Sequence, residues 1–99
     1  MQLELHEHSI LEKQFLTFHR ENLQVYDKLV ELAFILKNRG HRKIGIAMLF
    51  EQLRWLHALE TTDISGFKLN NNHAAFYSRM IMDRNTALDG FFKVREQAR

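Results

Sequence analysis

Apolar residues recur at helical spacing along most of the chain, which predicts a mainly α fold. The first apolar stripe follows Ser9 and Glu12, whose separation matches a capping box, and it indicates a helix that ends near Glu21. Residues 1–8 show only weak apolar–polar alternation. We therefore predict a flexible N-terminal arm over residues 1–8 and a single small helical domain over residues 9–99.

Three further helices follow from the same spacing. Asn22 is a favourable N-cap for a second helix, which Gly40 can close in the left-handed conformation. A third helix is predicted from about Ile44 to Ala58, and a fourth from about His73 to Arg84. Because the connection between the second and third helices is short, these two helices are expected to pack as a hairpin.

The remaining segments predict a small amount of β structure. Asn85 and Gly90 bound a short fifth helical turn, while residues 67–69 and 91–94 have the composition of short strands. Pairing of these strands beside the fourth helix would give a winged-helix-like domain with a helix-turn-helix core. The Asn run at 70–72 is typical of a turn that leads into a helix.

Composition limits the class of protein. The chain has 99 residues, enough for one small domain, and it contains no cysteine, which excludes disulfides, thiolate zinc sites and thiol catalysis. No apolar run approaches the roughly 20 residues that span a bilayer. Residues 1–12 carry three acids and no base, unlike a secretory signal, so we expect a cytoplasmic protein without a membrane partner.

Motifs typical of enzymes are absent from the sequence. None of Ser9, Ser65 and Ser78 lies in a Gly-x-Ser-x-Gly elbow, and the four glycines are too isolated to form a phosphate loop. The histidines are scattered, and the nearest pair, His6 and His8, lacks a third ligand. We therefore predict no catalytic residue, no metal site and no cofactor.

Charge is distributed unevenly, although the formal net charge is only +2. Residues 1–31 contain three bases and six acids, a net charge of −3, whereas residues 32–99 contain eleven bases and six acids, a net charge of +5. The basic part is compatible with a nucleic-acid partner or an acidic protein partner, although many small domains share such a balance.

Two patches in the basic part predict binding to double-stranded DNA. The turn before the third helix holds three bases and no acid, and it can bind phosphate together with backbone amides of the helix start. The Asn-rich entry to the fourth helix can contact bases, because Asn matches adenine and Arg matches guanine. We predict phosphate contacts from Arg39, Arg42, Lys43 and Lys68, and base contacts from Asn71, Asn72, His73 and Arg79.

Two alternatives stay open at this point. The Asn run can be a turn only, with one Asn as the N-cap, and Arg79 can pair with Asp83. The chain can also be a protein–protein interaction module, either a homodimer or bound to another host or phage protein, because its apolar content exceeds what a small core needs. Some of five side chains would form this surface: Trp55, Met80, Met82, Phe91 and Phe92.

Seven segments together carry a resemblance: Phe18–Asn22, Val25–Tyr26, Gly45–Ile46, Leu49–Trp55, Phe67–Asn72, Tyr77–Arg79 and Gly90–Phe92. They resemble a family of small uncharacterised bacterial proteins, often encoded in prophages, over about Phe18 to Arg95. The resemblance implies a DNA transaction or host-factor binding rather than metabolism, without an activity to transfer. It also implies Pro at the positions of Leu23 and Thr86, which favours a helix start at each.

Overall fold

The computed structural model describes residues 2–60 and 69–93, with side chains from residue 9 onward. Within these ranges every regular element is a helix, so the predicted mainly α fold is confirmed. None of these helices is both long and apolar enough to cross a membrane. The elements in chain order are α1 (Gln2–Glu21), α2 (Leu23–Asn38), α3 (Ile46–Glu60), the 3-10 turn η1 (Asn71–His73), α4 (Ala74–Arg84) and the 3-10 turn η2 (Thr86–Leu88).

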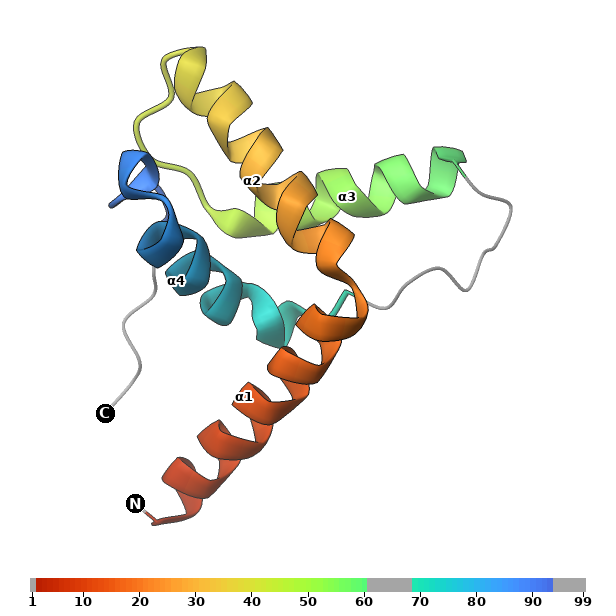
Figure 1. Cartoon of the computed structure of the whole chain (residues 1–99), viewed down its shortest axis with the longest axis vertical. Helices are drawn as coiled ribbons and strands as arrows, with labels where there is room; N and C mark the ends of the chain where they lie inside the picture. The colour runs from red at the N-terminus through yellow and green to blue at the C-terminus, as the bar shows by residue number, and fades with distance from the viewer. Residues whose placement is uncertain (1, 61–68, 94–99) are drawn as a thin grey trace.

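The helices form a flat arrangement of 41 × 34 × 21 Å, about two helix diameters thick. In Figure 1, α2 crosses α3, α4 lies below the start of α3, and α1 extends away from this group. Contacts join α2 to α3 and α4, while α1 contacts α2 and η1. The end of α1 is therefore held by both the start of α2 and the start of α4.

A single apolar core fills the space between these elements. It is strongly aromatic: Tyr77 of α4 is fully buried, with Phe15 of α1 and Phe50 of α3 packed edge-on against its ring at centroid distances of 4.7 and 6.1 Å. Tyr77 thus joins three helices. Among the described residues, the other fully buried side chains are Leu29, Ala33, Phe50, Ser78, Ile81, Leu88 and Phe92.

Two asparagines end helices rather than begin them. Asn22 occupies the predicted N-cap position of α2, but its Nδ2 donates 3.0 Å to the Phe18 carbonyl of α1. Asn85 behaves in the same way, since its Nδ2 donates 2.9 Å to the Ile81 carbonyl of α4. The Phe18 carbonyl is one that the end of α1 leaves without a backbone partner, whereas the Ile81 carbonyl also accepts the Asn85 backbone amide at 3.0 Å.

The end of α2 has the predicted glycine closure. Gly40 has φ +103°, and the amides of Gly40 and His41 donate to the carbonyls of Lys37 and Leu36 at 3.0 and 3.1 Å. This pair of bonds is a Schellman motif, which requires a left-handed residue at the glycine position. Gly90, with φ +73°, similarly follows η2 as predicted.

Two helix predictions need correction. α1 begins at Gln2 instead of Ser9, because residues 2–8 contain no Gly or Pro that would break the helix. The helices α2 and α3 are in contact but cross each other instead of forming a hairpin (Figure 1). The connecting residues 39–45 include an extended stretch, which allows α3 to leave in a different direction.

The predicted pairing of two strands is also not found within the described ranges. Phe92 instead forms an isolated parallel bridge with Ile44. The Ile44 amide donates 2.9 Å to the Phe91 carbonyl, and the Lys93 amide donates 2.8 Å to the Ile44 carbonyl. Residues 67, 68 and 94 of the predicted strands lie outside the described residues, and Leu69 is not in a strand.

Candidate functional site

The entry to α4 is attached to α3 by one arginine. An Nη atom of Arg54 donates to the Leu69 carbonyl at 2.8 Å and to Asn71 Oδ1 at 2.7 Å, and the guanidinium also pairs with Glu51. The pairing of Glu51 with Arg54 is expected from their spacing of three residues on a helix. Because Arg54 binds both the backbone and the side chain of this segment, it fixes η1 against α3.

The Asn run is a capping structure, as one of the open alternatives proposes. Asn70 is the N-cap of η1, and its Oδ1 accepts a 2.8 Å bond from the amide of Asn72. The Asn70 carbonyl accepts a second bond, of 2.9 Å, from the His73 amide. Asn71 and Asn72 follow the cap, and their side chains are exposed. Asn70 therefore caps η1, while the next two asparagines present their side-chain amides to solvent.

A groove of about 370 Å³ lies between the starts of α3 and α4. Its walls are formed mostly by small side chains. Asn71 and Asn72 stand on one side, and Lys93 is the charged residue among the described lining. The complete described lining is Gly45, Ile46, Ala47, Asn71, Asn72, Ala74, Ala75, Ser78 and Lys93.

The groove has a positive electrostatic character. The first amides of a helix have no partner within the helix and carry a partial positive charge, and Ile46 and Ala47 provide such amides at the start of α3. Arg42 and Lys43 are exposed just before this helix. No acidic residue occurs anywhere between positions 32 and 50. A phosphate is therefore the kind of ligand that this side of the groove favours.

The bridge between Ile44 and Phe92 sets the position of Lys93. Phe91 and Phe92 are buried at 2% and 1% exposure, so they anchor the chain just before Lys93. The Lys93 backbone is then bonded to Ile44, and its exposed side chain reaches the groove beside Gly45. Lys93 is absent from the predicted contact set, since this pairing joins segments that are distant in sequence.

The structure divides the predicted DNA contacts into several groups. Arg39, Arg42 and Lys43 are all exposed on the connection between α2 and α3. Asn71 and Asn72 line the groove. Lys68 lies outside the described residues.

Two predicted base contacts lie away from the groove. His73 is only 6% exposed and packs against Phe15 and Phe18, with ring centroids 5.8 and 5.1 Å away. Arg79 is half-buried, and its guanidinium carbon lies 5.4 Å from the ring centroid of Phe76. Asn71 faces solvent, whereas His73, two residues later, points into the core, because successive positions of a helix face different directions.

Burial also controls the protonation of the two core histidines. Burial lowers the pKa of both His73 and His19. The positive charge of Arg84 lowers the pKa of His19 further, and the negative charge of Asp27 raises it in part. Each ring has a buried Nδ1 atom without a hydrogen-bond partner among the described residues. Both rings are therefore neutral parts of the core at neutral pH, rather than ligands of the groove.

The apolar surface predicted around Phe91 and Phe92 is wrong, because both rings fill the core. They anchor the C-terminal segment against Ile44, and this pairing turns them away from solvent. Met80 and Met82 are half-buried against the same core. Trp55 alone of the five predicted residues is exposed, at 59%.

Comparison with protein-family models, with curated proteins and with solved structures finds no match to this chain. Across the part of the chain that the structure describes, no three His, Cys, Asp or Glu side chains are grouped so that they could hold a metal ion. The function has to be inferred from the groove and from the surfaces around it.

Proposed function

We propose that this chain is a non-catalytic module that binds double-stranded DNA through the groove between α3 and η1–α4. The observation that supports this most is the groove itself, which brings together the start of α3 and the Asn71–Asn72 pair. The sequence predicts phosphate contacts for the first segment and base contacts for the second. In the proposed complex they contact the same duplex.

Phosphate binding is assigned to the basic side of the groove. Lys93 and the first amides of α3 line the groove, and Arg42 and Lys43 extend its positive charge along the connection before α3. Cations and helix-start amides are the groups that contact DNA phosphates most often. Arg39 lies at the far end of this connection, where it closes α2, and we assign it a peripheral phosphate contact.

Base contacts are assigned to the two groove asparagines, with different roles. Asn71 Oδ1 already accepts a hydrogen bond from Arg54, so its amide nitrogen is the atom best placed to donate to a base. Asn72 uses its backbone amide for the cap, and its exposed side chain retains both an acceptor and donors. Asn72 is therefore suited to the paired contact with adenine. This arrangement does not depend on a β wing.

Salt dependence provides the direct test. The experiment measures fluorescence anisotropy of labelled mixed-sequence duplexes with the full chain over a series of salt concentrations. With four cationic phosphate contacts, from Arg39, Arg42, Lys43 and Lys93, the slope of log K against log salt is expected to be about −3.6. Absence of binding at low salt, or an affinity that does not change with salt, overturns the proposal.

A matched pair of variants locates the contact. Lys43→Gln combined with Lys93→Gln removes two positive charges beside the groove and should reduce the magnitude of the slope by about 1.8. Lys13→Gln combined with Arg20→Gln removes the same charge from exposed positions of α1 and should leave the slope unchanged. Equal losses in the two double variants would show that any binding is unrelated to the groove.

A separate variant tests base reading. Asn72→Ala leaves the cap intact, since the cap uses only the Asn72 backbone amide. It should reduce the difference in affinity between duplexes of different sequence while leaving the salt slope unchanged. If Asn72→Ala changes the slope but not the discrimination, the assignment of Asn72 to a base is wrong.

A further inference from the structure

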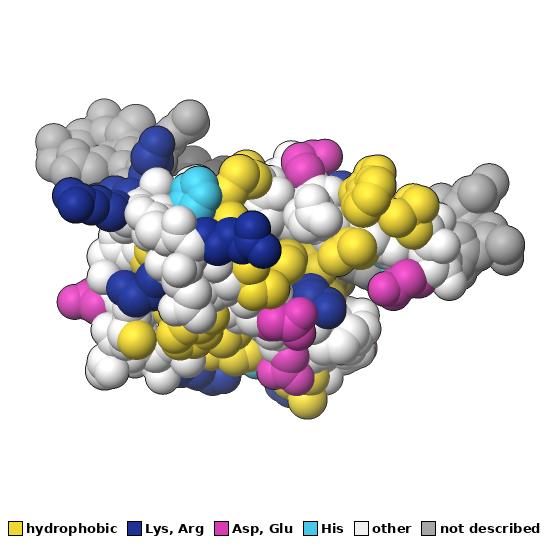
Figure 2. All heavy atoms as spheres, turned by 90° about the horizontal axis from the view of Figure 1, so that it is seen from above, with side chains coloured by type: hydrophobic (Ala, Val, Ile, Leu, Met, Phe, Trp, Pro, Cys, Tyr) yellow, Lys and Arg dark blue, Asp and Glu magenta, His cyan; other side chains and the backbone are white. Residues whose placement is uncertain are grey.

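The exposed face of α3 is unusually apolar. Met48, Trp55 and Leu59 are exposed at 49%, 59% and 64%, and together with Gln52 they occupy positions that fall on one side of a helix. We call these four residues the α3 stripe. Figure 2 shows exposed hydrophobic side chains gathered toward the end of the molecule where α3 lies, while Lys and Arg side chains gather toward the other end.

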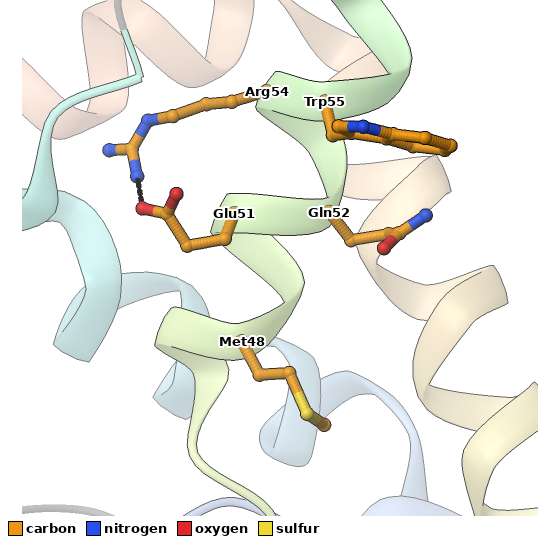
Figure 3. A pocket seen from close by; sticks show the side chains of 5 residues that line it. All are labelled: Met48, Glu51, Gln52, Arg54 and Trp55. Atoms are coloured by element: carbon orange, nitrogen blue, oxygen red, sulfur yellow. Dashed lines mark hydrogen bonds and ion pairs between the residues drawn. The ribbon is translucent and has the colours of Figure 1, made fainter.

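The charged residues of α3 point away from this stripe. Figure 3 shows Met48, Gln52 and Trp55 projecting from one side of the helix, and Glu51 and Arg54 projecting from the other. These five residues line an open depression of about 800 Å³. Glu51 is the only charged residue among the exposed positions from 47 to 59, and its carboxylate is paired with Arg54.

The stripe does not suit a nucleic acid or a charged peptide. Arg54 is held by Glu51, Leu69 and Asn71, so its charge is directed toward η1. A polyanion would lose hydration at Trp55 and Met48 without gaining an ion pair. The favourable contact for such a face is another uncharged apolar helix, because burial of its side chains is driven by their removal from water.

We propose that α3 pairs with α3 of a second copy of this chain in an antiparallel, twofold arrangement. A twofold interface places the same surface on both partners, so that surface must be complementary to itself. The α3 stripe meets this condition because it opposes no like charges. The helix ends differ in sign, with Arg42 and Lys43 before α3 and Glu60 at its end, so an antiparallel pair brings unlike charges together. The opposed helix dipoles favour the same arrangement.

The spacing along the helix indicates the register. When the twofold axis passes between Gln52 and Trp55, Met48 lies opposite Leu59 of the second copy and Gln52 lies opposite its Trp55, and the reciprocal contacts form on the other side of the axis. All four residues of the α3 stripe then have a partner. This correspondence of positions is the specific content of the proposal.

The size of the stripe limits its affinity. A 15-residue helix is about 22 Å long and about 10 Å wide with its side chains, so each partner contributes roughly 220 Å², which is below the range of stable specific interfaces and fits only a weak, transient contact. A dissociation constant on the order of 10–100 µM is therefore expected rather than a permanent dimer. The pairing does not depend on DNA and is independent of the proposed function.

The single tryptophan makes the test direct. The chain contains one Trp, so Trp emission, excited at wavelengths that tyrosine does not absorb, reports on the α3 stripe alone. Sedimentation and Trp emission are measured on the full chain over the same concentration series. The proposal predicts a monomer–dimer equilibrium and a shift of emission to shorter wavelength over the same range. A chain that remains monomeric up to about 500 µM, or a dimer with unchanged Trp emission, overturns it.

Two variants distinguish the α3 stripe from other exposed apolar residues. Leu59→Gln keeps the fluorescent probe and adds a polar group at an exposed position, and it should weaken pairing by at least about tenfold. Leu23→Gln makes the same change on α2, where Leu23 is 56% exposed, and should leave pairing unchanged. Circular dichroism confirms that both variants are folded. Equal pairing by the two variants would place the interface elsewhere and overturn the proposal.

Discussion

The hydroxyl of Tyr77 makes the most specific energetic prediction. Tyr77 is fully buried at the junction of α1, α3 and α4, where its ring packs edge-on against Phe15 and Phe50. Its oxygen is buried and has no hydrogen-bond partner among the described residues. The side chain therefore combines well-packed carbon atoms with a polar atom that has been removed from water.

Removal of that oxygen should stabilise the protein. A buried polar group without a partner costs about 1–3 kcal/mol, and Tyr77→Phe removes the oxygen while leaving the ring contacts in place. Some of this gain is lost because the space of the oxygen is left unfilled. We therefore expect a net gain of about 1 kcal/mol, which corresponds to a rise in Tm of about 4–8 °C for a domain of this size.

Urea unfolding followed by far-UV circular dichroism measures this difference. Tyr77→Leu serves as the control that removes the ring itself, and it should destabilise the fold because both edge-on ring contacts are lost. Burial also raises the pKa of Tyr77, so its contribution to stability is present below about pH 10 and is lost above it. The Phe variant should show a smaller alkaline loss. A Phe variant that is less stable than the natural chain at neutral pH refutes the reasoning.

Three further predictions concern the core and the helix ends. Burial lowers the pKa of His19 and His73 below the ordinary value of 6.5, so the contribution of these rings to the free energy of unfolding should be fully present above that pH and lost below it. The loss should be at most about 1.4 kcal/mol per pH unit for each ring. Denaturation at a series of pH values measures this loss, and an unchanged pH dependence in His73→Phe would contradict the prediction. Arg54→Met should cost about 1–3 kcal/mol and accelerate amide exchange around Asn71, whereas no change in exchange there would show that the Arg54 bonds are dispensable. Thr86→Pro should keep or raise Tm, because Thr86 is the first residue of η2 and follows an extended residue; a clear drop would show that the helix start is misplaced.

The helices could be predicted from sequence because their signals are local. The apolar stripes of α2, α3 and α4 appear at helical spacing, and Gly40 is needed at the left-handed position that closes α2. The direction in which each helix leaves its connection was not predictable in the same way. Asn22 and Asn85 show why: each was expected to cap the following helix, but each donates to a carbonyl of the preceding one. Both uses of the amide are compatible with the same local sequence.

The candidate site was predictable in its parts but not in its assembly. The bases of the connection before α3 and the Asn run can be identified from residue type, and their exposure follows from their polarity. The inclusion of Lys93 depends on pairing between Phe92 and Ile44, which are remote in sequence. The exclusion of His73 depends on Phe15 and Phe18 of α1 covering its ring. Such long-range packing leaves no periodic signal.

Arg54 connects the two surfaces proposed for this chain. Its bonds to Leu69 and Asn71 hold the wall of the groove, and its pairing with Glu51 removes the one charge that would otherwise border the α3 stripe. Arg54→Met should therefore weaken both DNA binding and helix pairing, since it loosens η1 and leaves Glu51 unpaired beside an apolar contact. Lys93→Gln should weaken only DNA binding, and Leu59→Gln only pairing. A loss of both activities in Arg54→Met, and of one activity in each of the other two variants, follows because the Arg54 guanidinium contacts both η1 and Glu51.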